Sequence, residues 1–115
     1  MSLKITEQES NGITTLALDG RLVLGEETNS FRNEINKLLA AGRKKIVLDV
    51  AHVTYIDSSG VGALAGCYHS ATSKGASLKL ANLGNRFREI LQVTRLLTIF
   101  ETYDSGSAAA KSFSA

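Results

Sequence analysis

Hydrophobic and polar residues alternate at the start of the chain. Residues 3–9 and residues 13–19 each show a period of two, which is the period of a half-buried β-strand. The dipeptide Asn11-Gly12 between them is typical of a tight hairpin turn. One face of the second segment is expected to carry Thr14, Leu16 and Leu18. The pattern predicts that an antiparallel β-hairpin opens the domain, followed by a turn and a brief strand over residues 20–25.

A helical period follows over residues 26–41. Its apolar stripe has the spacing i, i+4, i+7 and i+8 and consists of Phe31, Ile35, Leu38 and Leu39. Glu26 and Glu27 suit the positive N-terminal end of a helix, and Gly42 suits its C-terminal stop. We therefore expect an amphipathic helix that packs one face on the sheet.

Residues 46–50, Ile-Val-Leu-Asp-Val, are nearly continuous in β-forming residues. Such a run predicts a central strand that is covered on both faces. Residues 52–56 are expected to connect this strand to the next helix, with His52 exposed in a loop. No metal site is expected, because no second ligand stands at metal-binding spacing from His52.

The helix that follows should run from about residue 58 to residue 74. Its core stripe is predicted to consist of Val61, Leu64, Ala65 and Tyr68. A second face carries only small, uncharged side chains, namely Ser59, Gly62, Ala63, Gly66, Ser70 and Ser73. Each glycine inside a helix destabilises it by about 1 kcal/mol relative to alanine. The presence of Gly62 and Gly66 on this face therefore requires an explanation. Either it docks a partner protein, which we favour, or it packs on a neighbouring helix of the same domain.

The pattern continues with a strand and a helix. Residues 76–81 alternate as a strand with Leu78 and Leu80 pointing inward. Residues 85–92 are expected to form a helix that Asn85 caps. Its apolar face consists of Phe87, Ile90 and Leu91.

The last part of the chain is expected to add an edge strand and a terminal helix. Residues 99–100 are predicted as the edge strand, and Asp104 as the cap of the helix, with Ala108 and Phe113 folding back on the core. The order of elements predicts a single α/β domain over residues 1–115. Its architecture is a sandwich with a small mixed sheet, about four helices and right-handed crossovers between the parallel strands.

Composition limits the function classes. The 115 residues carry a formal net charge of +2, which is too mild to indicate a nucleic-acid partner. The single cysteine, Cys67, excludes an internal disulfide and is expected to be a packing residue. No apolar run approaches the length of a membrane span. We therefore expect a cytoplasmic protein without membrane insertion.

The chemistry is concentrated in Asp57-Ser58-Ser59-Gly60, at the start of the second helix. Asp57 is a good N-cap residue, which makes Ser58 the first helical residue and leaves its hydroxyl free. A nucleophilic serine is disfavoured, because His69 lies about three turns further along the same helix. A nucleotide cradle is disfavoured, because the glycines lack the Walker lysine. Neither a cofactor nor an enzymatic activity is expected.

Two interpretations of this motif remain. In the first, Asp57 caps the helix and the serines are merely solvated. In the second, Ser58 is a reversible phosphorylation site. A helix N-terminus accommodates a phosphate well, and the added charge of roughly −1.5 to −2 would repel a partner matched to an uncharged surface.

Residues 55–62, Tyr-Ile-Asp-Ser-Ser-Gly-Val-Gly, resemble the STAS domain of the bacterial anti-sigma factor antagonist family. The similarity extends to the Gly20-Arg21-Leu22 corner, the strand at residues 46–49 and the later Leu78-Lys79-Leu80. It implies a STAS-like sandwich and a partner-switching role. An anti-sigma factor serine kinase would bind the chain, phosphorylate Ser58 and be released, and a phosphatase would restore the binding form. Ser59 is the fallback site.

The resemblance also implies a docking surface made of the second helix and the corner at residues 20–27. Its corner residues are Arg21, Val23, Glu26 and Glu27. Val23 stands where family members often have an aspartate, so acidic character must come from the two glutamates. We also allow for a weak homodimer. The alternative function is a STAS interaction subunit of a stress-signalling or lipid-transport ATPase assembly, without a phosphorylation switch.

Overall fold

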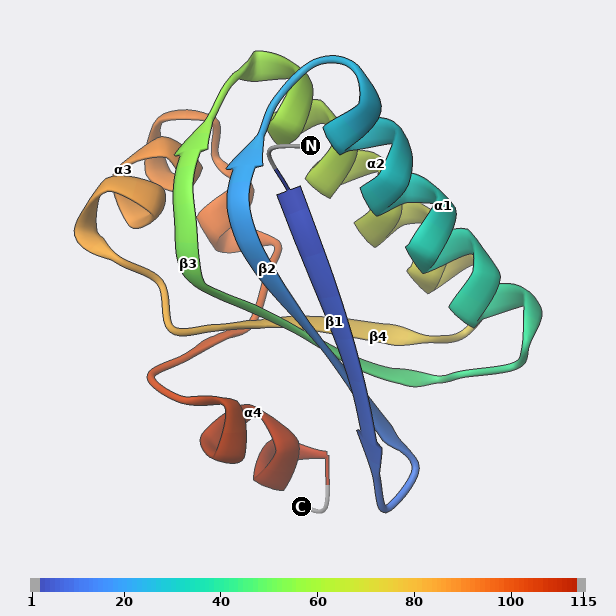
Figure 1. Ribbon diagram of the computed structural model, residues 1–115. Helices are drawn as coiled ribbons and strands as arrows, with labels where there is room; N and C mark the ends of the chain where they lie inside the picture. Colours follow the sequence, from blue (N-terminus) through green and yellow to red (C-terminus); the bar gives the residue numbers. More distant parts are fainter. Residues whose placement is uncertain (1–2, 114–115) are drawn as a thin grey trace.

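The computed structural model describes residues 3–113, which form a sheet flanked by helices (Figure 1). Its elements in chain order are β1 (Leu3–Ser10), β2 (Ile13–Leu22), α1 (Glu26–Ala40), β3 (Lys45–Ile56), α2 (Ser58–Ser73), β4 (Ser77–Ala81), α3 (Asn85–Val93), the 3₁₀ helix η1 (Leu96–Thr98), β5 (Thr102–Tyr103) and α4 (Gly106–Ser112). The α/β class and the mixed sheet agree with the expectation from the sequence. Within residues 3–113 no helix is long and apolar enough to cross a membrane.

The sheet has the strand order β1-β2-β3-β4-β5. β1 and β2 pair antiparallel around a turn in which Asn11 and Gly12 have φ of 54° and 79°. Positive φ at both central residues is the signature of a type I′ hairpin turn, which Asn-Gly favours. The remaining pairs are parallel. The predicted hairpin is therefore confirmed.

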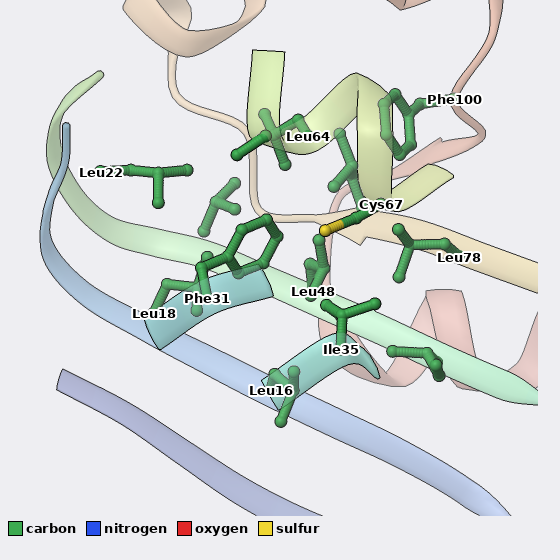
Figure 2. Close-up of a cluster of buried hydrophobic side chains, with 14 of the residues drawn as sticks. Leu16, Leu18, Leu22, Phe31, Ile35, Leu48, Leu64, Cys67, Leu78 and Phe100 are labelled. Atoms are coloured by element: carbon green, nitrogen blue, oxygen red, sulfur yellow. The ribbon is translucent and has the colours of Figure 1, made fainter. Parts of the chain in front are cut away.

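Helices cover both faces of the sheet. The larger core lies between the sheet and α1, α2 and α3, and Figure 2 shows Leu16, Phe31, Leu48 and Leu64 converging in it. The predicted stripe of α1, namely Phe31, Ile35, Leu38 and Leu39, is entirely buried there. On the opposite face Val47 and Ala81 pack against Ala109 of α4. The prediction that β3 is a central strand covered on both faces is confirmed.

β3 is longer than expected. Residues 52–56 are not a connection but the second half of the strand, and they pair with the end of β2 through two register irregularities. His52, Thr54 and Tyr55 are exposed, whereas Val53 is partly buried and Ile56 is buried in the core. His52 is exposed as expected, but in a strand. The extension carries β3 directly to Asp57.

The C-terminal part differs from the prediction in four details. The cap of α3 is Gly84, and Asn85 is already the first helical residue. The edge strand is β5 rather than residues 99–100, because Phe100 is buried edge-on against Tyr68 with ring centroids 4.9 Å apart. Ser105, not Asp104, caps α4 through its hydroxyl, and Ala109 rather than Ala108 is the buried alanine.

A buried lysine fixes α4 to the sheet. Lys79 on β4 is 8% exposed, and its Nζ lies 3.3 Å from a Glu101 carboxylate oxygen. The same Nζ donates to Ser112 Oγ at 2.7 Å and lies 4.1 Å from the ring centre of Phe113. Because a buried charge is costly unless it is paired, these contacts account for the docking of the terminal helix.

α2 is rotated relative to the prediction. Its buried residues are Gly60, Ala63, Leu64, Cys67 and Ala71. Of the predicted stripe only Leu64 is fully buried, while Val61, Ala65 and Tyr68 are partly buried and pack on the edge of the core. Most sides of α2 carry apolar or small side chains. The hydrophobic periodicity of the sequence therefore could not define which side of the helix faces the core. Small residues face inward because the helix lies close to the sheet and to α1.

Candidate functional site

Asp57 joins the start of α2 to the corner between β2 and α1. Its Oδ1 accepts a hydrogen bond from the Gly60 N–H at 2.9 Å, as expected for an N-cap residue. Its Oδ2 accepts a second bond from the Leu24 N–H at 3.1 Å. The Asp57 N–H donates to the Leu22 carbonyl oxygen at 3.3 Å. One side chain thus caps the helix and holds the corner beside it.

The two hydrogen bonds that the Asp57 side chain accepts stabilise the ionised form of its carboxylate. The bond from the Leu24 N–H, followed by that from Gly60, holds the pKa of Asp57 below its ordinary value of 3.8. A carboxyl whose pKa is lowered on folding stabilises the fold above its unfolded pKa. That contribution is lost as the pH falls from about 3.8 through the lower, folded value.

We expect Asp57→Ala to lower the midpoint of thermal unfolding, because both carboxylate bonds are lost. Asp57→Asn should lower it less, since asparagine is also a favoured N-cap residue. Thermal denaturation followed by circular dichroism at neutral pH measures both effects. The difference between the unmodified chain and Asp57→Asn should shrink as the pH is lowered below 3.8. Equal midpoints for all three chains at neutral pH would contradict this role.

Gly60 allows the helix to start close to the corner. A Cβ built on Gly60 would overlap the Leu22 carbonyl oxygen and stand 2.7 Å from Ile56 Cγ1. Real Cβ atoms do not approach neighbours so closely, so only glycine fits. A close approach of another backbone to α2 therefore occurs at Gly60, and not at Gly62 or Gly66, the two glycines of the small-residue face. Within residues 3–113, no heavy atom from outside the neighbouring helix backbone lies within 4 Å of a Cβ built on Gly62.

Ser58 is the first residue of α2 and is exposed. Within residues 3–113 its hydroxyl makes no hydrogen bond, because the cap is supplied by Asp57. Ser59 is partly buried. Of the two serines, Ser58 is therefore the more exposed.

The small-residue face of α2 does not lie entirely on the surface. Ala63 has no exposed area, so its assignment to a partner-binding surface is wrong. Ser59, Gly66 and Ser70 are partly buried, and Gly62 and Ser73 are exposed. A Cβ on Gly66 would stand 3.8 Å from Arg32 Nη1, so α1 borders this side of the helix. One edge of the face therefore packs inside the domain and the other edge is open; docking of a partner protein on the open edge stays a prediction.

The corner adds a residue that the sequence reasoning missed. Leu24 is 74% exposed, although its N–H is held by Asp57. Of the predicted corner residues, Arg21 and Glu26 are exposed, and Val23 and Glu27 are partly buried. The available signal was a leucine next to Gly25, at the end of the turn and brief strand predicted over residues 20–25. The corner therefore presents an apolar side chain beside Ser58.

Cys67 takes no part in this surface. It is buried in the core (Figure 2), and burial raises the pKa of its thiol to about 11. The thiolate is the reactive form, so we expect a thiol reagent at pH 8 to leave native Cys67 unmodified and to react after denaturation. Mass spectrometry measures the outcome, and rapid modification of the native chain would contradict it. Within residues 3–113 no group of three or more His, Cys, Asp or Glu side chains could hold a metal ion.

Comparison with known proteins places this chain in a family. The sequence profile of the STAS domain matches residues 4–109. BtrV of Bordetella bronchiseptica, named as a candidate anti-sigma factor antagonist, is 25% identical over 111 residues, which cover 96% of this chain and 95% of BtrV.

Solved structures share the fold. A candidate anti-sigma factor antagonist of Thermotoga maritima matches with a TM-score of 0.87 at 24% identity, over 94% of this chain and 92% of that protein. The cell fate determinant SpoIIAA of Bacillus, in its phosphorylated form, matches with a TM-score of 0.76 at 18% identity, over 96% of this chain and 99% of SpoIIAA. With a profile match over nearly its whole length and the same fold as these proteins, the chain belongs to the STAS domain family.

Proposed function

We propose that this chain is an anti-sigma factor antagonist that works by partner switching. The unmodified chain binds an anti-sigma factor serine kinase and so frees the sigma factor, and phosphorylation of Ser58 ends the complex. The observation that carries the proposal is the exposed Ser58 hydroxyl, which stands free at the start of α2 while Asp57 supplies the cap. The chain acts as a cytoplasmic regulator rather than as an enzyme and needs no cofactor. A phosphatase regenerates the binding form.

The proposed docking surface lies on both sides of Ser58. On one side is the corner, with Arg21, Val23, Leu24, Glu26 and Glu27. On the other is the open edge of α2, with Gly62 and Ser73 exposed and Ser59, Gly66 and Ser70 partly exposed. A partner matched to this surface packs against Leu24 and reaches the helix backbone at Gly62, where no side chain intervenes.

A phosphate on Ser58 changes this surface without unfolding it. The helix N-terminus tolerates the added charge of roughly −1.5 to −2. The Asp57 carboxylate next to it and the exposed Glu26 at the corner make the surroundings acidic. A bound partner would have to desolvate the phosphate together with this acidic cluster, which costs binding free energy.

Phosphate mapping tests the proposal. The purified chain, with ATP and the anti-sigma factor kinase of the same organism, should gain one phosphate on Ser58. Ser58→Ala should abolish the incorporation and Ser59→Ala should leave it intact, because Ser58 is exposed whereas Ser59 is partly buried. Peptide mass spectrometry assigns the site.

Loss of phosphorylation in Ser59→Ala but not in Ser58→Ala would instead assign the phosphorylation site to Ser59. A chain that is never phosphorylated, in this reaction or in cells under different growth conditions, would contradict the switch. It would favour the alternative of a STAS interaction subunit in a stress-signalling or lipid-transport ATPase assembly.

A further inference from the structure

α4 covers the face of the sheet that is opposite to α1 and α2 (Figure 1). Within residues 3–113 the buried cluster beneath it consists of Val47 of β3, Ala81 of β4 and Ala109 of α4 itself. In the same part of the chain, the larger core on the other face includes no residue of α4. α4 therefore packs as a layer of its own, and its detachment would leave the larger core intact.

α4 is short and buries little apolar surface. Its seven residues, Gly106–Ser112, include three alanines, of which only Ala109 is fully buried. A helix shorter than about 12 residues is marginal in water, so α4 stays helical only while it is docked. A hollow of about 140 Å³ is lined by Ala110 and by hairpin residues such as Gln8 and Thr15, so the packing of α4 is incomplete on that side. Docking of α4 therefore contributes only a small free energy.

The charge beneath α4 keeps its partner when α4 leaves. Lys79 Nζ lies 3.3 Å from a Glu101 carboxylate oxygen, and Glu101 precedes β5 and is not part of α4. The Tyr103 hydroxyl donates to the same carboxylate at 2.7 Å. The two contacts from the C-terminal segment are neutral, namely the Ser112 hydroxyl at 2.7 Å and the Phe113 ring, whose centre is 4.1 Å away. Unpairing a buried charge is strongly destabilising, but here undocking leaves the ion pair in place and opens Lys79 Nζ to water.

The chain just before α4 is held by the sheet. The Leu80 N–H donates to the Glu101 carbonyl oxygen at 3.0 Å, and the Asn82 N–H donates to the Tyr103 carbonyl oxygen at 2.9 Å. These backbone hydrogen bonds join β5 to β4. Detachment of α4 can therefore end at the short connection of residues 104–105, without loss of the pairing between β4 and β5.

We propose that α4 is a detachable strap, which opens and closes while the rest of the domain stays folded. Segments with few buried apolar contacts open at a lower free energy than the core of the same protein. Opening uncovers an apolar strip of the sheet that includes Val47 and Ala81, with the paired Lys79 beside it. The strap thus controls whether this strip, on the face of the sheet opposite to α2, is exposed.

Amide hydrogen exchange followed by NMR tests the strap in the full chain. The Ala109 N–H donates to the Ser105 carbonyl oxygen at 3.1 Å. After correction for intrinsic rates, it should exchange about a hundredfold or more faster than the Leu80 and Asn82 amides. The latter two amides report the pairing between β4 and β5, and they should stay protected.

Ala109→Glu should hold the strap open, because an unpaired carboxylate cannot stay buried against Val47 and Ala81. The fluorescence of anilinonaphthalene sulfonate, a dye that binds exposed apolar surface, should then rise about threefold or more. Ser107→Glu is the matched control. It adds the same charge at an exposed position in the first turn of α4, where the helix dipole favours it, and should leave the dye fluorescence unchanged.

Three results would overturn the proposal. They are an Ala109 amide that exchanges as slowly as the Leu80 amide, an equal dye response of Ala109→Glu and Ser107→Glu, and loss of Leu80 and Asn82 protection in Ala109→Glu. The first would make α4 part of the cooperative core, and the last would show that β5 leaves together with α4. Circular dichroism of both variants checks that the remaining fold is retained. None of these measurements involves the kinase, so their outcome is independent of the Ser58 switch.

Discussion

Ser58→Asp is expected to bind the anti-sigma factor kinase about a hundredfold more weakly than the unmodified chain, because a charge is placed at the centre of the proposed interface. Ser58→Ala should bind as tightly as the unmodified chain, since the Ser58 hydroxyl makes no hydrogen bond within residues 3–113. Isothermal titration calorimetry with the purified kinase measures both. The expected effect is large because the aspartate adds to the negative charge of Asp57 and Glu26.

The fold should not be affected by either substitution. An aspartate in the first turn of a helix interacts favourably with the positive end of the helix dipole, and the Asp57 cap remains in place. Ser59→Asp is the positional control. It puts the same charge one residue further along, on a partly buried side chain, and should weaken binding less than Ser58→Asp. Equal affinity of Ser58→Ala and Ser58→Asp for the kinase would contradict the switch.

The parts of the site that depend on local sequence could be predicted. Asp57 as cap follows from the preference of helix N-termini for short acceptor side chains. Ser58 as the free hydroxyl follows from that cap. Two further elements depend on local sequence in the same way. The turn type that Asn11-Gly12 favours defines the hairpin, and the helical periodicity of apolar residues defines the buried stripe of α1. The structure agrees with the sequence on each of these elements.

The rotation of α2 could not be predicted, because it depends on contacts from distant parts of the chain. Ala63 and Gly66 are similar in size and polarity, yet Ala63 is fully buried while Gly66 is only partly buried, at the border with α1. Only the packing of α2 on the sheet and on α1 distinguishes them. The exposure of Leu24 has the same origin, since the hydrogen bond from its N–H to Asp57 spans 33 residues of sequence. A surface composed of such contacts is visible only in three dimensions.

Gly60→Ala is expected to destabilise the domain by about 3 kcal/mol or more, because the new methyl group would overlap backbone atoms rather than a movable side chain. The Cβ would meet the Leu22 carbonyl oxygen on one side and Ile56 Cγ1, at 2.7 Å, on the other. Both neighbours belong to strands of the sheet, so neither can move without disturbing the ladder between β2 and β3. Thermal unfolding should shift down by roughly 10 °C or more.

Gly62→Ala in the same helix is the matched control, and it should change the stability of the domain in the opposite direction. In the part of the chain that the structure describes, no heavy atom from outside the neighbouring helix backbone lies within 4 Å of a Cβ at Gly62. Alanine at this position therefore causes no clash and gains about 1 kcal/mol of helix propensity. The unfolding midpoint should therefore rise by a few degrees. If Gly60→Ala and Gly62→Ala shifted the midpoint equally, the close contact of α2 with the Leu22 corner would not be what requires glycine at position 60. Opposite shifts would show that one glycine is needed for the fold, whereas the other leaves the helix open at the surface where the partner is expected to dock.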